Sequence, residues 1–211
     1  MYIPPCNAEQ DLATLHDLIA KHPLGTWITL ATEGLTANHI PFLIDRARGP
    51  HGTLRAHVAR ANPVWRELSG EQESMVVFQG PQSYITPSWY PTRLNSGAVV
   101  PTWNYAVVQA KGIAQVQHDP AWILQMISDL TDQQESTRAL PWKVSDAPAA
   151  FIERLAQAIV GIEIPLDSLS GKWKLSQDEA HADRLGTVAG LAASMDVNSQ
   201  TLSHMVNERI A

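Results

Sequence analysis

The order of its hydrophobic patterns limits the fold of this chain more than any other feature. Between residues 25 and 116, short segments rich in β-branched and aromatic residues follow one another, separated by tracts of glycine, proline and asparagine. Such turn-bounded segments are typical of β-strands. Longer helical patterns are confined to the first 21 residues and to the chain after residue 118. This order favours a mainly β fold with α, an antiparallel β-barrel with flanking helices, over a βαβ sheet.

Capping and turn residues place individual elements within this order. Asn7 and Gln10 have the spacing of a capping box, so we expect a helix over residues 8–21. Two strands, at residues 74–79 and 83–86, are expected on either side of a Gly-Pro pair. No low-complexity linker divides the chain. We therefore expect a barrel domain with inserted helices over residues 1–180 and a helical C-terminal tail over residues 181–211.

Composition excludes several classes of protein. The 211 residues contain one cysteine, Cys6, so an intramolecular disulfide is impossible. Against 21 acidic residues there are 15 lysines and arginines, so the chain lacks the positive field that attracts nucleic acid non-specifically. It shows no signal-peptide pattern and no apolar run of about 20 residues, which predicts a cytoplasmic protein without a membrane partner. The eight histidines form no metal-ligand spacing, so no metal site is expected, and no catalytic residue is identified.

Residues 84–105 form an aromatic segment without helical or strand periodicity through its middle. It holds three of the four tyrosines and two of the seven tryptophans. A loop of this length is usually functional or disordered, and disordered segments are poor in aromatic residues. Flat apolar walls with a few hydrogen-bonding groups are what a cofactor pocket needs. The alternative is a surface loop packed on its own aromatic rings.

Two further patterns could bind an anion. The first runs from His57 through Arg60 to Asn62, where a strand leads into a helix that Asn62 would cap, so that an arginine lies beside free backbone N–H groups. The second places Lys172 and Lys174 on one face of an extended segment. Each has a plainer alternative, because surface arginines beside a helix cap and solvated lysine pairs are both common.

The C-terminal segment, residues 188–206, resembles a helix-turn-helix DNA reader. Asp196, Val197 and Asn198 would form the turn. The surrounding segment is poor in basic residues, so any DNA contact through this tail would be weak. The alternative is an ordinary helical packing or dimerisation element.

Five motifs carry a resemblance to a known family: HIPFLID, LRAHVARANPVW, YITPSWY, VPTWNY and GKWKLSQ. Together they resemble the PaiB family of FMN-binding negative transcriptional regulators, which is related to the pyridoxamine-phosphate-oxidase-like split barrels. The match runs from the N-terminus to about residue 177 and departs from the family pattern directly afterwards. The resemblance implies a six-stranded antiparallel split barrel that forms a homodimer with two FMN sites at the subunit interface.

The resemblance also implies which residues surround the FMN. At the phosphate and ribityl end it places His57, Arg60 and Asn62. The two aromatic motifs would contribute Thr86, Ser88, Trp89, Trp103, Asn104 and Tyr105. The last motif would close the pocket from the second subunit with Lys172, Trp173, Lys174 and Gln177.

Three functions are compatible with these patterns. The first is a flavin-dependent transcriptional regulator. The second is a flavin oxidoreductase, either an FMN reductase or a pyridoxamine-phosphate-oxidase-like enzyme, for which His39 and His57 would be the nearest acid or base candidates. The third is a barrel that has lost the flavin and serves as an interaction module.

Overall fold

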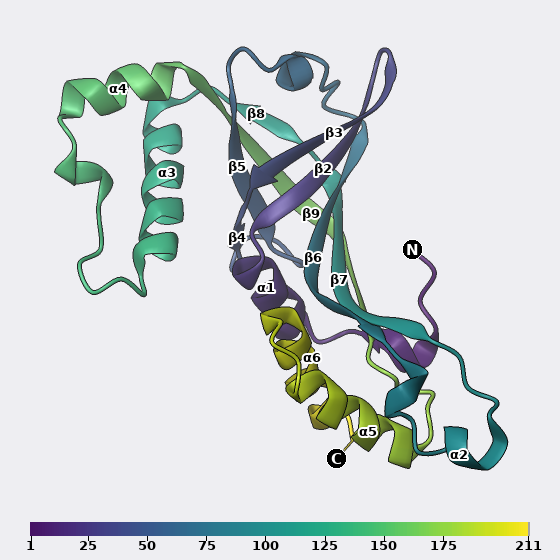
Figure 1. Ribbon diagram of the computed structural model, residues 1–211. Coiled ribbons are helices and arrows are strands. Elements are labelled where there is room, and N and C mark those ends of the chain that lie inside the picture. Colours follow the sequence, from purple (N-terminus) through teal and green to yellow (C-terminus); the bar gives the residue numbers. More distant parts are fainter. Residues whose placement is uncertain (211) are drawn as a thin grey trace. The chain divides into compact units, whose positions relative to one another are not determined.

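Nine β-strands form the framework of residues 1–210, the part of the chain that the computed structural model describes; the side chain of Ser96 also lies outside the description (Figure 1). The sheet order is β3-β2-β6-β7-β9-β5-β4, with β1 and β8 pairing on β9. The strands are β1 (Ala8–Glu9), β2 (Leu24–Ala31), β3 (Gly34–Pro41), β4 (Leu43–Asp45), β5 (Thr53–Ala59), β6 (Glu73–Ile85), β7 (Thr102–Ile113), β8 (Gln115–Gln117) and β9 (Ile159–Lys174).

Six α-helices accompany the strands within these residues: α1 (Leu12–Lys21), α2 (Arg93–Ser96), α3 (Pro120–Glu135), α4 (Ala149–Gln157), α5 (His181–Ala192) and α6 (Val197–Glu208). Short 3-10 turns lie at Pro5–Asn7, Pro63–Arg66, Pro87–Trp89 and Val144–Asp146. No helix among the described residues is long and apolar enough to cross a membrane.

The expected antiparallel, mainly β class is confirmed, but the strand number differs. β2 pairs antiparallel with β3 and β6, and β9 with β1, β5 and β8. The described residues contain six strands of seven residues or more, which is the expected number. Three strands of two or three residues, β1, β4 and β8, raise the total to nine. Such short segments lack enough residues to show a period-2 pattern.

Two expected boundaries are wrong. The first helix begins at Leu12 rather than at residue 8, because Ala8 and Glu9 pair with β9 and the Asp11 carboxylate caps the helix by accepting the Thr14 N–H at 2.8 Å. The two strands expected around a Gly-Pro pair are one strand, β6. β6 pairs with β2 through residues 75–77, so the missing N–H of Pro81 falls outside that ladder.

The chain divides into two compact units. The first comprises Met1–Leu15, Gln79–Val108 and the chain from Ser170 onward, and the second comprises His16–Phe78 and Gln109–Leu169. Each of the long strands β6, β7 and β9 contributes residues to both units. The expected division into residues 1–180 and a tail stays a prediction.

The second unit has an aromatic core on which a helix is held by buried charge. Trp27, Phe42 and Phe78 are fully buried. Glu163 of β9, only 5% exposed, accepts two hydrogen bonds from Arg48, at 2.6 and 2.9 Å, and one from the indole N–H of Trp122 at 3.2 Å. Trp122 belongs to α3, so the buried carboxylate fixes the start of this helix on β9.

Two other contacts seat α3 on the same strands. A Cβ atom on Gly161 of β9 would lie 2.4 Å from the Trp122 ring, so only glycine leaves room for the indole. Two turns beyond Trp122, Asp129 of α3 forms an ion pair of 2.9 Å with Arg55 of β5. The helix is thus held at both a packing contact and a charge contact.

In the first unit, α5 and α6 pack on each other, and α5 also packs on the aromatic segment. The Ser203 hydroxyl of α6 donates to the Val188 carbonyl of α5 at 2.9 Å. Asp196 begins α6 as its N-cap, accepting from the Ser199 N–H at 2.9 Å. The expected helical pair is confirmed, with Asp196 ending the turn and Val197 already in the second helix.

Removing Arg48 should destabilise the fold. The substitution Arg48→Met leaves the Glu163 carboxylate buried without its cation, so we expect the free energy of unfolding to fall by about 3 kcal/mol. Urea denaturation at pH 7 would measure it. The control Lys111→Met breaks an exposed ion pair with Glu73 and should cost less than about 1 kcal/mol. Equal effects of the two substitutions would contradict the role assigned to Glu163.

Candidate functional site

Aromatic and cationic side chains gather on one face of the strands in the first unit. Trp103 of β7 donates its indole N–H to the Gln82 side chain of β6 at 3.0 Å, and its ring meets the Tyr84 ring edge-on, with centroids 6.1 Å apart. Tyr84 and Trp103 are each 48% exposed. The open face therefore presents two large rings and an amide group.

Two lysines of β9 join these rings. The Lys172 ammonium lies 5.4 Å from the ring centroid of Tyr105 and 5.9 Å from that of Tyr2. The Lys174 ammonium donates to the Thr102 hydroxyl at 2.5 Å and to the Trp103 carbonyl at 3.2 Å. Four of the predicted cofactor residues, Trp103, Tyr105, Lys172 and Lys174, are thus brought together. We call this surface the aromatic–cationic face.

Asn104 and Trp173 of the same motifs point the opposite way and are buried, and Gln177, just after β9, is half-buried. Trp173 is 4% exposed. Asn104 is fully buried and donates to the Ser176 hydroxyl at 2.9 Å, while its side-chain oxygen has no partner among the described residues. Gln177 accepts from the Leu175 N–H and donates to the Trp173 carbonyl, both at 2.6 Å. Asn104, Trp173 and Gln177 therefore support the strand ends, and their contact with a cofactor stays a prediction.

The first half of the aromatic segment is packed on α5. Thr86 caps the turn Pro87–Trp89, with its hydroxyl 2.8 Å from that of Ser88. A Cβ atom on Gly190 would lie 2.2 Å from the Trp89 indole, so this glycine lets α5 approach the ring. The backbone N–H and hydroxyl of Thr92 both donate to Asp183 in the first turn of α5. Thr86, Ser88 and Trp89 serve this packing; their predicted contact with flavin is untested.

Tyr90 is the most buried tyrosine of the segment. It is 1% exposed, and burial, together with the carboxylates of Glu179, Asp183 and Asp178, raises its pKa to about 12. The hydroxyl therefore stays protonated at neutral pH. This tyrosine belongs to the core rather than to an open cofactor wall.

The three residues expected at the phosphate lie in the second unit. Arg60 donates through Nε to the Gln157 carbonyl at 2.7 Å and through Nη2 to the Ile159 carbonyl at 2.8 Å. Asn62 caps the turn Pro63–Arg66 as expected, accepting from the Val64 N–H at 3.0 Å. These contacts occupy the capping groups of Asn62 and one edge of the Arg60 guanidinium. Their predicted role at a phosphate stays a prediction.

His57 of β5 is a neutral imidazole at physiological pH. Burial lowers its pKa below the ordinary value, and its Nδ1 atom has no partner among the described residues. A neutral ring can donate or accept a hydrogen bond but adds no positive charge at a phosphate. Among residues 1–210, no three His, Cys, Asp or Glu side chains converge as a candidate metal site.

The aromatic–cationic face has the chemistry that a flavin needs. Aromatic rings can stack on a flat heterocycle, the Gln82 amide can pair with its polar edge, and two ammonium groups can neutralise an anionic tail. Thr102, whose hydroxyl accepts from Lys174, adds a further polar group beside these rings. The residues present therefore fit a flavin.

Residues 1–168 match the family described as "Putative FMN-binding domain". The chain belongs to this family. An uncharacterized protein of Emericella nidulans is 33% identical over 244 residues, covering 99% of this chain and 97% of its own. The protease synthase and sporulation protein PAI 2 of Bacillus subtilis is 25% identical over 210 residues, covering 100% of this chain and 98% of its own. The resemblance to the PaiB family is confirmed, and with it a flavin-binding type of domain.

Solved structures confirm the fold class. The FAD and heme binding protein of Mycobacterium smegmatis has a TM-score of 0.59 at 18% identity, covering 80% of this chain and 73% of its own. The flavocytochrome Anf3 of Azotobacter vinelandii has a TM-score of 0.56 at 14% identity, covering 79% and 68%. At these identities the likeness concerns the antiparallel split-barrel fold alone.

Sequence reasoning missed Gln82, Tyr84 and Tyr2 as members of the aromatic–cationic face. Tyr84 was available as the first residue of the aromatic segment, and its alternation with Gln82 along a strand would have placed both on one face. Tyr2 carries no such signal, because Lys172, the residue whose ammonium lies over its ring, is far from it in the sequence.

Substituting Gly190 should loosen the packing of Trp89. Although alanine favours a helix by about 1 kcal/mol over glycine, its Cβ would overlap the indole, so we expect Gly190→Ala to lower the free energy of unfolding by about 1–3 kcal/mol. Urea denaturation would measure this. In a Trp89→Ala background the same substitution should be neutral or stabilising. An equal loss of unfolding free energy in both backgrounds would contradict the contact assigned between Gly190 and Trp89.

The stability of the protein should fall as the pH is lowered from about 7, in part through His57. The unfolded chain binds the proton near the ordinary histidine pKa of about 6.5, whereas the folded chain binds it only at lower pH. As the pH falls from the unfolded-state pKa to the lower folded-state pKa of His57, proton binding therefore stabilises the unfolded state and lowers the free energy of unfolding. The variant His57→Gln should show a shallower decline in unfolding free energy over this window, and His181→Gln, at an exposed position, the wild-type decline. Matching slopes for His57→Gln and wild type would refute this.

Proposed function

We propose that the protein is a cytoplasmic homodimer that binds FMN on the aromatic–cationic face and acts as a flavin-dependent transcriptional regulator. The convergence of Trp103, Tyr105, Lys172 and Lys174 in a member of an FMN-binding family carries this proposal. FMN is favoured because its single phosphate is a compact dianion, which two ammonium groups from one strand can neutralise.

A second copy of the chain is proposed because one copy leaves the face open. Tyr2 is 82% exposed, and Tyr84 and Trp103 are each 48% exposed. Cofactor sites usually bury 70–90% of the bound molecule. The missing wall would come from the second subunit, in agreement with the arrangement implied by the family resemblance.

Regulation would act through the α5–α6 pair. The N-terminal half of α6 exposes Asn198, Gln200 and Thr201, polar side chains that could contact base edges. The formal net charge of −6 limits non-specific attraction to DNA, so binding would depend on such contacts and on low salt. Fluorescence anisotropy with promoter DNA, with and without FMN, tests this part. Binding no stronger than to random DNA in both states would remove the regulatory role and leave the flavin site in place.

The flavin site is tested by titrating FMN into purified protein and following the quenching of its fluorescence. Replacing Lys172 or Lys174 with alanine removes a charge-assisted contact worth about 1.5–3 kcal/mol, so each variant should bind FMN about 10- to 100-fold more weakly. The control is Lys111→Ala, which removes a lysine paired with Glu73 in the second unit and should bind FMN normally. If all three variants bind FMN with equal affinity, the FMN phosphate does not lie on this face.

A further inference from the structure

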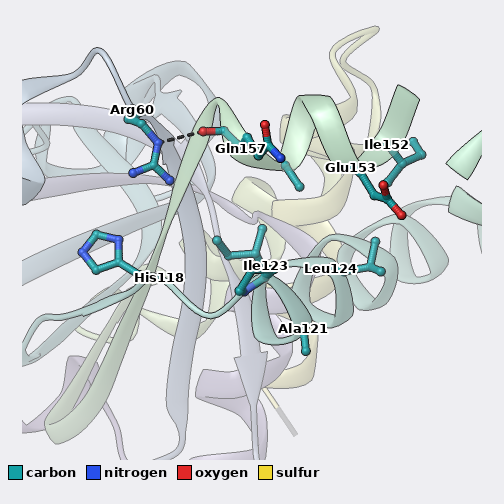
Figure 2. A pocket seen from close by; sticks show the side chains of 10 residues that line it. Arg60, His118, Ala121, Ile123, Leu124, Ile152, Glu153 and Gln157 are labelled. Carbon is teal, nitrogen blue, oxygen red and sulfur yellow. Dashed lines mark hydrogen bonds between the residues drawn. The ribbon is translucent and has the colours of Figure 1, made fainter. Parts of the chain in front are cut away.

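The second unit contains a cavity of about 440 Å³ between α3 and α4 (Figure 2). Its middle is apolar, formed by Ile123 and Leu124 of α3 and Ile152 and Ala156 of α4. Arg60 and Glu153 also line it. A volume of this size lies within the range of small-molecule sites. In Figure 2, Arg60 and Glu153 lie toward opposite ends of the apolar middle.

The guanidinium group of Arg60 is held rigidly at this cavity. Its Nε and Nη2 atoms donate to the carbonyls of Gln157 and Ile159, and its main-chain N–H donates to the Ala158 carbonyl at 2.8 Å. The Arg60 carbonyl in turn accepts the indole N–H of Trp65 at 3.1 Å. Backbone and side chain are thus fixed together, so the arginine pays little further conformational entropy when it binds a ligand.

The hydrogen bonds to Gln157 and Ile159 use one edge of the Arg60 guanidinium, and a second edge is available to a ligand. The Nε and Nη2 donors that face the two carbonyls form the side edge, whereas Nη1 and the second N–H of Nη2 form the end edge. In Figure 2 the terminal nitrogens are turned toward the side of the cavity where His118 and Ile123 lie. Two parallel N–H groups on one guanidinium edge match the two oxygens of a carboxylate.

Glu153 gives the other end of the cavity the opposite charge. It lies one turn before Gln157 on α4, and no ion pair of its carboxylate is recorded among residues 1–210. A ligand with a second negative group there would meet like-charge repulsion, which disfavours binding. The cavity is therefore complementary to a molecule with a single carboxylate and an apolar body.

We propose that this cavity binds a monocarboxylate with an aliphatic or aromatic body, separately from the flavin. The end edge of Arg60 binds the carboxylate, Ile123, Leu124 and Ile152 contact the body, and Glu153 excludes dicarboxylates. The charges at its two ends favour a small amphipathic ligand over an apolar segment of a second chain. The proposal does not depend on the flavin site, because every residue it uses lies in the second unit.

Calorimetric titration of the full chain with hexanoate, adipate and hexanol tests the proposal. Hexanoate should bind saturably, and adipate and hexanol at least 10-fold more weakly, because one adds a repelled charge and the other lacks the carboxylate. The variant Glu153→Gln should keep hexanoate binding and bring adipate to within about 3-fold of it. No saturable hexanoate binding to folded protein, or adipate binding as well as hexanoate in the wild type, would overturn the proposal.

Matched substitutions locate the site. Ala156→Trp fills the cavity and should abolish hexanoate binding, whereas Leu155→Trp, at the preceding position of α4 and outside the lining, should preserve it. Circular dichroism confirms that each variant is folded. If hexanoate still binds to folded Ala156→Trp, the ligand lies elsewhere. If Ala156→Trp instead changes the oligomeric state measured by light scattering, while the wild type binds no hexanoate, the cavity is a contact between copies and the proposal is wrong.

The same variants separate this proposal from the proposed function. Ala156→Trp should bind FMN with wild-type affinity, and Lys172→Ala should bind hexanoate with wild-type affinity. Loss of hexanoate binding alone would remove the carboxylate site, and loss of FMN binding alone would remove the flavin site. Loss of both ligands in either single variant would show that the two sites are one, against the independence proposed here.

Discussion

The buried charge of Glu163 is the constraint on which the arrangement of the second unit depends. A carboxylate that is 5% exposed must be paired, since an isolated buried charge is far more costly than an exposed one. Arg48 and the Trp122 indole meet this requirement from outside β9. Because Trp122 lies in the first turn of α3, satisfying one carboxylate also fixes the helix that forms one wall of the cavity. The fold of this unit and the shape of its cavity therefore share a cause.

In the first unit, the alternation of side chains along β7 and β9 places the residues that support the strands on one side and those of the aromatic–cationic face on the other. Odd and even positions of a strand face opposite sides, so Trp103 and Lys174 reach the open face while Asn104 and Trp173 are buried. The same short motifs can thus supply both the exposed rings and cations and the core that holds the strand ends in place. This explains why the cofactor residues predicted from VPTWNY and GKWKLSQ include buried neighbours such as Asn104 and Trp173 beside the members of the aromatic–cationic face.

The sequence predicted the class of fold and most long elements, because period-2 and period-3.6 patterns depend on local spacing alone. Its errors have a common origin in contacts between distant residues. The start of α1 was wrong because β9, more than 150 residues later, draws Ala8 and Glu9 into a strand. The packing of Trp89 on Gly190 was invisible for the same reason. The thirteen predicted cofactor residues were therefore chosen by motif and not by position in space. Four of them share the aromatic–cationic face.

At Arg60 the local sequence pattern predicted an arginine beside a helix cap but not which groups its guanidinium binds. An arginine beside a cap suggested an anion site, and the structure places its side edge against carbonyls at the end of α4, where a positive charge is favoured by the helix dipole. These two hydrogen bonds would be sufficient for an arginine whose role is structural alone. α4 has no buried residue of its own, and Arg60, which bonds its last carbonyl, lines the same cavity as the helix. Tethering one edge fixes the direction of the other, and a fixed guanidinium edge discriminates between anions better than a mobile one, because the geometry is set before the ligand arrives.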